Sequence, residues 1–120
     1  MSRDYRKLEV FRIADEAVMA VYPATCTFPN EERYGLVAQI RRAAISVACN
    51  IVEGSARRSE AEYLNFLNIA CGSANETEYL IGLSNRLTFM ENSVAEPLMS
   101  TYAKLGAKIQ ALINALNSKP

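Results

Sequence analysis

Adjacent arginines are the side chains of this sequence best suited to bind a ligand, and two such pairs occur in the segment 34–58. Arg57 and Arg58 follow the helical part of that segment, where we expect an exposed turn. They are therefore candidate contacts for the phosphates of a nucleic acid. Two exposed arginines in one chain give only weak non-specific affinity, unless a symmetric oligomer multiplies them.

The other pair, Arg41 and Arg42, lies inside the helical segment and leaves two interpretations open. Phosphate binding is one of them. The other is a charge pair within the chain, since a guanidinium is well suited to bidentate pairing with a carboxylate. Glu76 would supply that carboxylate, and Gln39 or Glu78 would extend the pair.

No group of residues in the sequence predicts catalysis or metal binding. The chain has no histidine, and its three cysteines form no CxxC pair, so a zinc site is not expected. We expect Cys26, Cys49 and Cys71 to be small buried thiols in a reducing compartment. Asn50 and Glu53 could act as a polar pair, but no nucleophile or second carboxylate accompanies them. We therefore expect a protein that is not an enzyme, with no cofactor and no small-molecule substrate.

Length and composition indicate one domain, residues 1–120. Half of the residues are apolar, yet no apolar run reaches the ~18 residues that span a bilayer. No signal peptide is visible at the N-terminus, so a cytoplasmic protein without a membrane partner is expected. The net charge is zero, but four arginines face one glutamate in 35–58, whereas six glutamates face one arginine in 59–96. This asymmetry favours charge pairing between these two segments inside the protein.

Apolar residues recur at steps of three and four along most of the chain, which predicts helices and no strand. The expected helices run from Tyr5 to Tyr22, where Pro23 ends the first; from Leu36 to a glycine C-cap at 53–55; from Ser59 to Phe89 or Met90; and from Val94 to Leu116.

The connection between the second and third of these helices is short. Ser59 and Glu62 have the spacing of a capping box, which indicates that the third helix begins at Ser59. This is directly after Arg57 and Arg58 and only a few residues after Gly54. Helices joined by so short a turn are antiparallel neighbours. The sequence therefore predicts an all-α protein, an antiparallel up-down-up-down four-helix bundle.

An antiparallel register predicts which residues of the second and third helices meet. Placing the turn at Arg57 and Arg58 sets Ala43 against Gly72, Arg42 against Ser73 and Asn50 against Asn65. Gly72 lies within a predicted helix, where glycine costs roughly 1 kcal/mol of stability relative to alanine. Either a close approach of two backbones or a kink would explain a glycine at this position. The expected seam between the helices consists of Arg41, Arg42, Ala43, Ala44, Asn50, Asn65, Gly72, Ser73 and Glu76.

The second helix carries two apolar stripes, whereas a surface helix of a monomer needs one. The first stripe suits the core of the bundle and consists of Leu36, Ile40, Ala43, Ala44, Val47 and Ile51. The second predicts a central position for the helix and a contact between subunits. Its residues are Val37, Ala38, Ile45, Ala48 and Val52.

Two long motifs resemble those of a known family of small bacterial proteins, the four-helix-bundle proteins encoded by intervening sequences in 23S ribosomal RNA (S23-type). The first motif is Phe28-Pro29-x-Glu31-Glu32-Arg33-Tyr34-Gly35-Leu36-x-x-Gln39-Ile40-Arg41-Arg42-Ala43-Ala44-x-Ser46-x-x-x-Asn50-Ile51-x-Glu53-Gly54. The second is Phe66-Leu67-x-Ile69-Ala70-x-Gly72-Ser73-x-x-Glu76, and the opening Tyr5-Arg6-Lys7-Leu8-Glu9-Val10 is also similar.

The resemblance implies a ring-like homopentamer in the cytoplasm, in a family whose members mostly have no assigned activity. The family is similar in fold to the accessory variability protein of diversity-generating retroelements, a basic pentamer that binds nucleic acid and a reverse transcriptase. Here Cys71 precedes Gly72 where that motif would have arginine, and the chain is neutral. The leading hypothesis is thus a non-enzymatic oligomeric scaffold or interaction module. The alternative is a nucleic-acid-binding oligomer that partners a nucleic-acid enzyme and uses Arg57 and Arg58, with Arg41 and Arg42.

Overall fold

The computed structural model describes residues 3–118, and this part of the chain contains four long α-helices and no strand. The all-α prediction is confirmed for these residues. The helices are α1 (Glu9–Thr25), α2 (Leu36–Ser55), α3 (Glu60–Arg86) and α4 (Asn92–Asn117), with short 3₁₀ helices at η1 (Tyr5–Lys7) and η2 (Asn30–Glu32).

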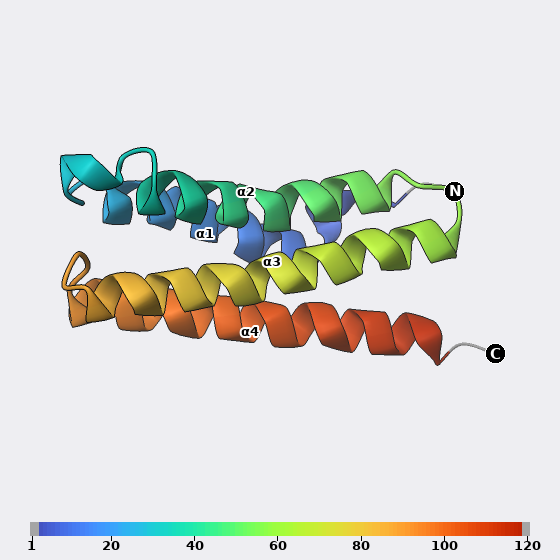
Figure 1. The fold of residues 1–120 in the computed structure, drawn as a ribbon. Helices are drawn as coiled ribbons and strands as arrows, with labels where there is room; N and C mark the ends of the chain where they lie inside the picture. The colour runs from blue at the N-terminus through green and yellow to red at the C-terminus, as the bar shows by residue number, and fades with distance from the viewer. Residues whose placement is uncertain (1–2, 119–120) are drawn as a thin grey trace.

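The four helices lie side by side along the long axis of a body that measures 50 × 21 × 19 Å (Figure 1). α2 packs against α1 and α3, and α4 packs against α3 and α1. The α1–α2 loop lies beside the α3–α4 loop, since the rings of Phe28 and Phe89 are 5.7 Å apart. At the other end, the backbone N–H of Arg3 donates to the carbonyl of Ser55, next to the α2–α3 turn (2.9 Å).

One stripe of each helix faces the core. On α2 the fully buried part of this stripe is the first apolar stripe of the sequence, with Ile40, Ala44, Val47 and Ile51 all at 0 % exposure. Leu36, at the start of the stripe, is half-buried. Two buried tyrosines, Tyr63 on α3 and Tyr102 on α4, belong to the core. The other inner residues of these two helices include Leu67, Ala70, Ala74, Ile81, Leu105 and Ile109.

The start and end of α1 differ from the sequence prediction. The backbone is extended at Leu8, which separates η1 from α1. Pro23 does not end the helix, which continues to Thr25. A proline in the last turn removes one hydrogen-bond donor, and here the Thr25 hydroxyl lies 3.0 Å from the Val21 carbonyl and 3.1 Å from that of Tyr22. Those bonds stabilise the last turn.

The predicted glycine C-cap of α2 is wrong. The helix continues through Gly54 to Ser55, and no glycine among the described residues has a positive φ. The Ser55 hydroxyl donates to the carbonyls of Ile51 (2.7 Å) and Val52 (3.0 Å), and Ala56 ends the helix in a right-handed conformation. A left-handed residue is therefore not needed at this end.

The N-cap of α3 is confirmed at Ser59. Its hydroxyl oxygen accepts from the backbone N–H of Glu62 (3.0 Å). The Glu62 carboxylate in turn accepts from the same hydroxyl (3.2 Å), so the reciprocal bond of a capping box is made through the side chain of Ser59. One backbone donor of the helix start is satisfied in this way.

A Schellman motif ends α3 at Arg86, earlier than the predicted Phe89 or Met90. The N–H of Phe89 donates to Ser84 (2.9 Å) and that of Thr88 donates to Asn85 (3.0 Å). Thr88 has φ 66°, the left-handed conformation that glycine usually supplies here. α4 then begins at Asn92, two residues before the predicted Val94.

Candidate functional site

The amino-terminal half of α2 is fixed to the end of α1 by one arginine. Arg41 Nε donates to Thr25 Oγ1 (2.9 Å), and Nη2 donates to the Tyr22 carbonyl (3.2 Å) and approaches Cys26 Sγ (3.8 Å). The guanidinium also lies over the Tyr22 ring, 4.3 Å from its centroid. These contacts hold the Arg41 head group in one orientation, against oxygen atoms that carry no formal charge.

The predicted charge pair between Arg41 and Glu76 is therefore wrong. Glu76 instead accepts from Gln39 Nε2 (2.6 Å), and Arg42 Nη1 donates to Gln39 Oε1 (3.2 Å). Adjacent residues of a helix are about 100° apart around its axis, so Arg41 and Arg42 cannot face the same neighbour. Arg41 faces α1, while Arg42 reaches the acid of α3 through an amide.

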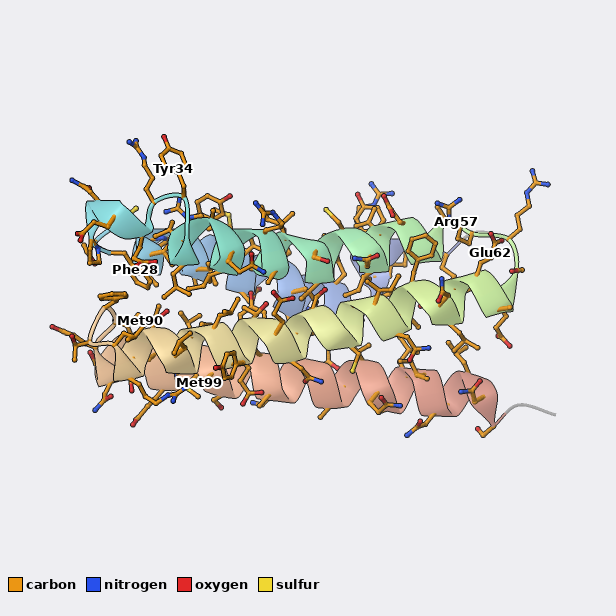
Figure 2. The ribbon with its side chains drawn as sticks, in the orientation of Figure 1. Phe28, Tyr34, Arg57, Glu62, Met90 and Met99 are labelled. Carbon is orange, nitrogen blue, oxygen red and sulfur yellow. The ribbon has the colours of Figure 1, made fainter. Side chains whose placement is uncertain are left out.

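A pocket of about 460 Å³ lies beside Arg41 at the loop end of the bundle. We call it the loop-end pocket; it is lined by Thr25, Cys26, Phe28, Pro29, Asn30, Arg33, Tyr34, Val37 and Arg41. Two arginines and no acidic side chain are among these residues. Tyr34 is 87 % exposed and projects away from the bundle, whereas Phe28 points toward the α3–α4 loop (Figure 2).

Sequence reasoning missed Arg33, Asn30 and Tyr34 as members of one site. They lie in and just after η2, a connection that the apolar spacing does not describe. The available signal was the unusual polarity of the stretch 30–34 beside Pro29.

α2 packs against α3 as expected, but Ser73 meets a residue one turn further along α2 than predicted. Ser46 Oγ lies 2.9 Å from Ser73 Oγ, where the predicted partner of Ser73 was Arg42. Asn50 does not cross to α3, because its amide donates to the carbonyl and hydroxyl of Ser46 (2.8 and 3.0 Å). Asn65, its expected partner, is exposed. Ala43 and Ala44 are buried in the core.

The close approach of α2 and α3 occurs at Gly54 and not at Gly72. A Cβ on Gly54 would lie 2.8 Å from Phe66 Cβ and 3.2 Å from Tyr63 Cδ1. A Cβ on Gly72 would meet nothing within 4 Å, because this residue is exposed. The close approach offered as one explanation for Gly72 is therefore wrong, and it occurs at Gly54 instead.

Arg57 and Arg58 are both exposed at the α2–α3 turn, as predicted. Arg57 is partly engaged, with its guanidinium 4.9 Å from the centroid of the Phe66 ring. Figure 2 shows Arg57 and Glu62 together at this end of the bundle. The turn therefore presents two cations to solvent, and the loop-end pocket lies at the opposite end.

The second apolar stripe of α2 is partly buried within the single chain. Val37 is 9 % exposed and belongs to the core, so its assignment to a subunit interface is wrong. Ala38, Ala48 and Val52 are half-buried. Ile45 is 39 % exposed, and Cys49, which belongs to neither of the predicted stripes, is exposed on the same helix.

The cysteines and tyrosines differ in exposure. Cys26 and Cys49 are exposed, which corrects the expectation that they are buried, and Cys71 is half-buried. Burial raises the pKa of the Cys71 thiol and of the phenols of Tyr63 and Tyr102. Between residues 3 and 118 no three histidine, cysteine or acidic side chains are grouped so that they could hold a metal ion.

Within the same residues, no helix is both long and apolar enough to cross a bilayer.

Two comparisons relate this structure to known proteins, while no curated protein matches the sequence. The crystal structure of a protein of unknown function from the S23 ribosomal protein family of Bacteroides thetaiotaomicron VPI-5482 is similar, with a TM-score of 0.80 and 26 % identity. The similarity covers 88 % of this chain and 95 % of that one. The family model of the 23S rRNA-intervening sequence protein matches residues 6–111. The chain belongs to the 23S rRNA-intervening sequence protein family.

Proposed function

We propose that the chain is a non-enzymatic scaffold protein of the cytoplasm that acts as a subunit of a homo-oligomer, a ring of five copies. Each subunit would be an antiparallel up-down-up-down bundle. The positions of the two loops at one end, and of the α2–α3 turn at the other, support that topology. The pentamer rests on the resemblance stated above.

The observation that carries the proposal is the outer face of α2. Ala38, Ile45, Cys49, Val52 and Ala56 follow one another at steps of seven, four, three and four residues. These steps are those of a heptad stripe, which two helices use to pack against each other. We call these five residues the outer stripe. None of them carries a charge, and the isolated chain leaves Ile45, Cys49 and Ala56 exposed.

Light scattering coupled to size-exclusion chromatography tests the proposal. The expected mass is five times the 13.3 kDa subunit. Ile45→Asp should yield a smaller species with the same helical circular dichroism, because it places a charge in a contact between apolar side chains. Val94→Asp is the matched control, since Val94 on α4 is also 39 % exposed. A monomer at micromolar concentration, or an unchanged mass for Ile45→Asp, contradicts the proposal.

A second candidate function is the binding of structured RNA or DNA as the partner of a nucleic-acid enzyme, and the exposure of Arg57 and Arg58 favours it. A symmetric oligomer would repeat this cationic pair once per subunit, which raises the effective affinity. Arg42 is exposed and can contribute, whereas Arg41 is engaged by α1.

Retention on structured RNA tests this second function. Binding at low salt should fall steeply by about 200 mM salt, because phosphate contacts release counterions. Arg57→Gln with Arg58→Gln should abolish it. Arg12→Gln with Arg86→Gln removes two exposed arginines elsewhere and should leave it intact. Absence of retention at low salt, or equal losses for both double variants, contradicts the function.

A further inference from the structure

The loop-end pocket concentrates positive charge that the protein itself does not neutralise. Arg33 and Arg41 line it, and none of its lining residues is acidic. The ion pairs found between residues 3 and 118 lie elsewhere, at Arg6–Asp4 and Lys108–Glu9. η2 carries two acids outside the lining: Glu32 accepts from the backbone N–H of Leu36 at the start of α2 (3.1 Å), and Glu31 is exposed. The pocket therefore has two cations and lacks an anion.

Arg41 is held ready to bind that anion. Its Nε and Nη2 atoms donate to Thr25 and Tyr22, which fixes the plane of the guanidinium. Within residues 3–118, Nη1 donates to no protein atom, so its two N–H groups remain available. A guanidinium fixed in this way loses little side-chain entropy when it binds an oxyanion.

The walls of the pocket indicate more than a bare ion. Its volume of about 460 Å³ is within the range of small-molecule sites, roughly 300–1,000 Å³. Phe28, Pro29 and Val37 contribute apolar surface. The Tyr34 ring is exposed at the same site, with the guanidinium of Arg33 5.8 Å from its centroid. An exposed aromatic ring beside arginine is a surface on which planar rings stack.

We propose that the loop-end pocket binds a small organic phosphate that carries a planar ring, a ligand of the nucleoside monophosphate class. The phosphate oxygens accept hydrogen bonds from Arg41 and Arg33, and the ring lies against Tyr34. A phosphate monoester carries a charge of about −1.5 to −2 near pH 7, which matches two uncompensated arginines better than a carboxylate does. This site is separate from the outer stripe, so the proposal goes beyond the scaffold function.

Titration calorimetry with 5′-AMP, adenosine and inorganic phosphate tests the proposal on the full chain. AMP should bind at least about tenfold more tightly than adenosine, because its phosphate accepts hydrogen bonds from two charged groups. AMP should also bind more tightly than inorganic phosphate, because of the ring. Equal binding of adenosine and AMP, or no heat from millimolar AMP, overturns the proposal.

Variants locate the binding in the pocket. Arg33→Gln should weaken AMP binding about tenfold without loss of stability, because Arg33 is exposed and its side chain makes no hydrogen bond in the described part of the chain. Arg41→Gln should weaken it at least as much, and Tyr34→Ala about fivefold or more through lost stacking.

Arg42→Gln is the matched control, because Arg42 is adjacent to Arg41 but does not line the pocket. It should leave AMP binding unchanged. An equal loss for Arg42→Gln and Arg33→Gln indicates general charge attraction and overturns the proposal. RNA binding without AMP binding also overturns it, while the nucleic-acid function at Arg57 and Arg58 would stand.

Discussion

The two ends of the bundle are built differently. At the end where α2 meets α3, a turn of four residues, 56–59, connects the helices. Gly54 packs against Phe66 there, and Ser59 caps α3. At the opposite end, the connections 26–35 and 87–91 are longer, Thr88 is left-handed, and the loop-end pocket lies beside Arg41.

The difference separates two modes of binding. A short turn brings the helices together so closely that its arginines project into solvent, where they can contact only an extended partner. A long connection leaves space between itself and the helix, and the arginine beside that space is fixed by hydrogen bonds. Small-molecule sites need such a concave, preformed surface. The exposed arginines of the turn end match the proposed macromolecular partner, and the loop-end pocket matches the proposed small ligand.

The largest expected effect is at the turn end. Gly54→Ala should lower the free energy of unfolding by about 2 kcal/mol, because overpacking costs roughly 1–3 kcal/mol. The nearest atom is Phe66 Cβ at 2.8 Å, which cannot move without its helix. Urea denaturation at a fixed subunit concentration measures the change.

Gly72→Ala is the matched control for this variant. Its new Cβ meets nothing within 4 Å, so the higher helix propensity of alanine should raise the free energy of unfolding by roughly 0.5–1 kcal/mol. Opposite signs for the two glycines are the expected result. A loss of stability for Gly72→Ala would show a contact at that residue, as in a subunit interface, and would contradict the single-chain account.

The next largest effect is at the loop end. Arg41→Gln should lower the free energy of unfolding by about 1.5 kcal/mol, since it removes hydrogen bonds to Thr25 and Tyr22. Arg42→Gln should change it by less than about 0.5 kcal/mol, because Arg42 is exposed and donates only to Gln39 in the described chain. Urea denaturation measures both changes. Similar losses for the two variants would mean that net charge, and not the contact with α1, determines the effect on the free energy of unfolding.

A smaller effect is expected from the cap at the turn end. Ser59→Ala should lower the free energy of unfolding by about 1 kcal/mol, because the N–H of Glu62 loses its acceptor. Ser59→Asn retains a side-chain acceptor and should keep most of the stability. Thermal unfolding followed by circular dichroism distinguishes the two. Equal melting temperatures would contradict a contribution of the cap.

The fold and the inner face of α2 could be predicted because apolar spacing reports which side of a helix is buried. Ile40, Val47 and Ile51 were assigned to the core on this basis, and they are buried. The short turn and the cap at Ser59 could also be predicted, since capping depends on local sequence.

The partners across the helices could not be predicted, because they depend on rotation and register. Arg41 and Arg42 are adjacent in sequence, but the rotation of α2 directs one toward α1 and the other toward α3. A register shift of one turn moved the partner of Ser73 from Arg42 to Ser46. Glycine has no side chain whose polarity would indicate whether it faces a neighbouring helix or solvent. The crowded Gly54 and the open Gly72 could therefore not be distinguished from the sequence.

The smallest expected effect is at Thr88, and like that of Gly72→Ala it is a gain in stability. A left-handed conformation costs an L-residue roughly 1–2 kcal/mol, whereas glycine adopts it freely but loses more entropy on folding, roughly 0.5–1 kcal/mol. Thr88, with φ 66°, should therefore accept glycine with a gain of about 0.5 kcal/mol in the free energy of unfolding. Thr88→Ala keeps a Cβ and should give no gain. Equal results for both variants in urea denaturation would contradict this prediction. They would mean that the left-handed residue of the Schellman motif does not limit the stability of the connection 87–91.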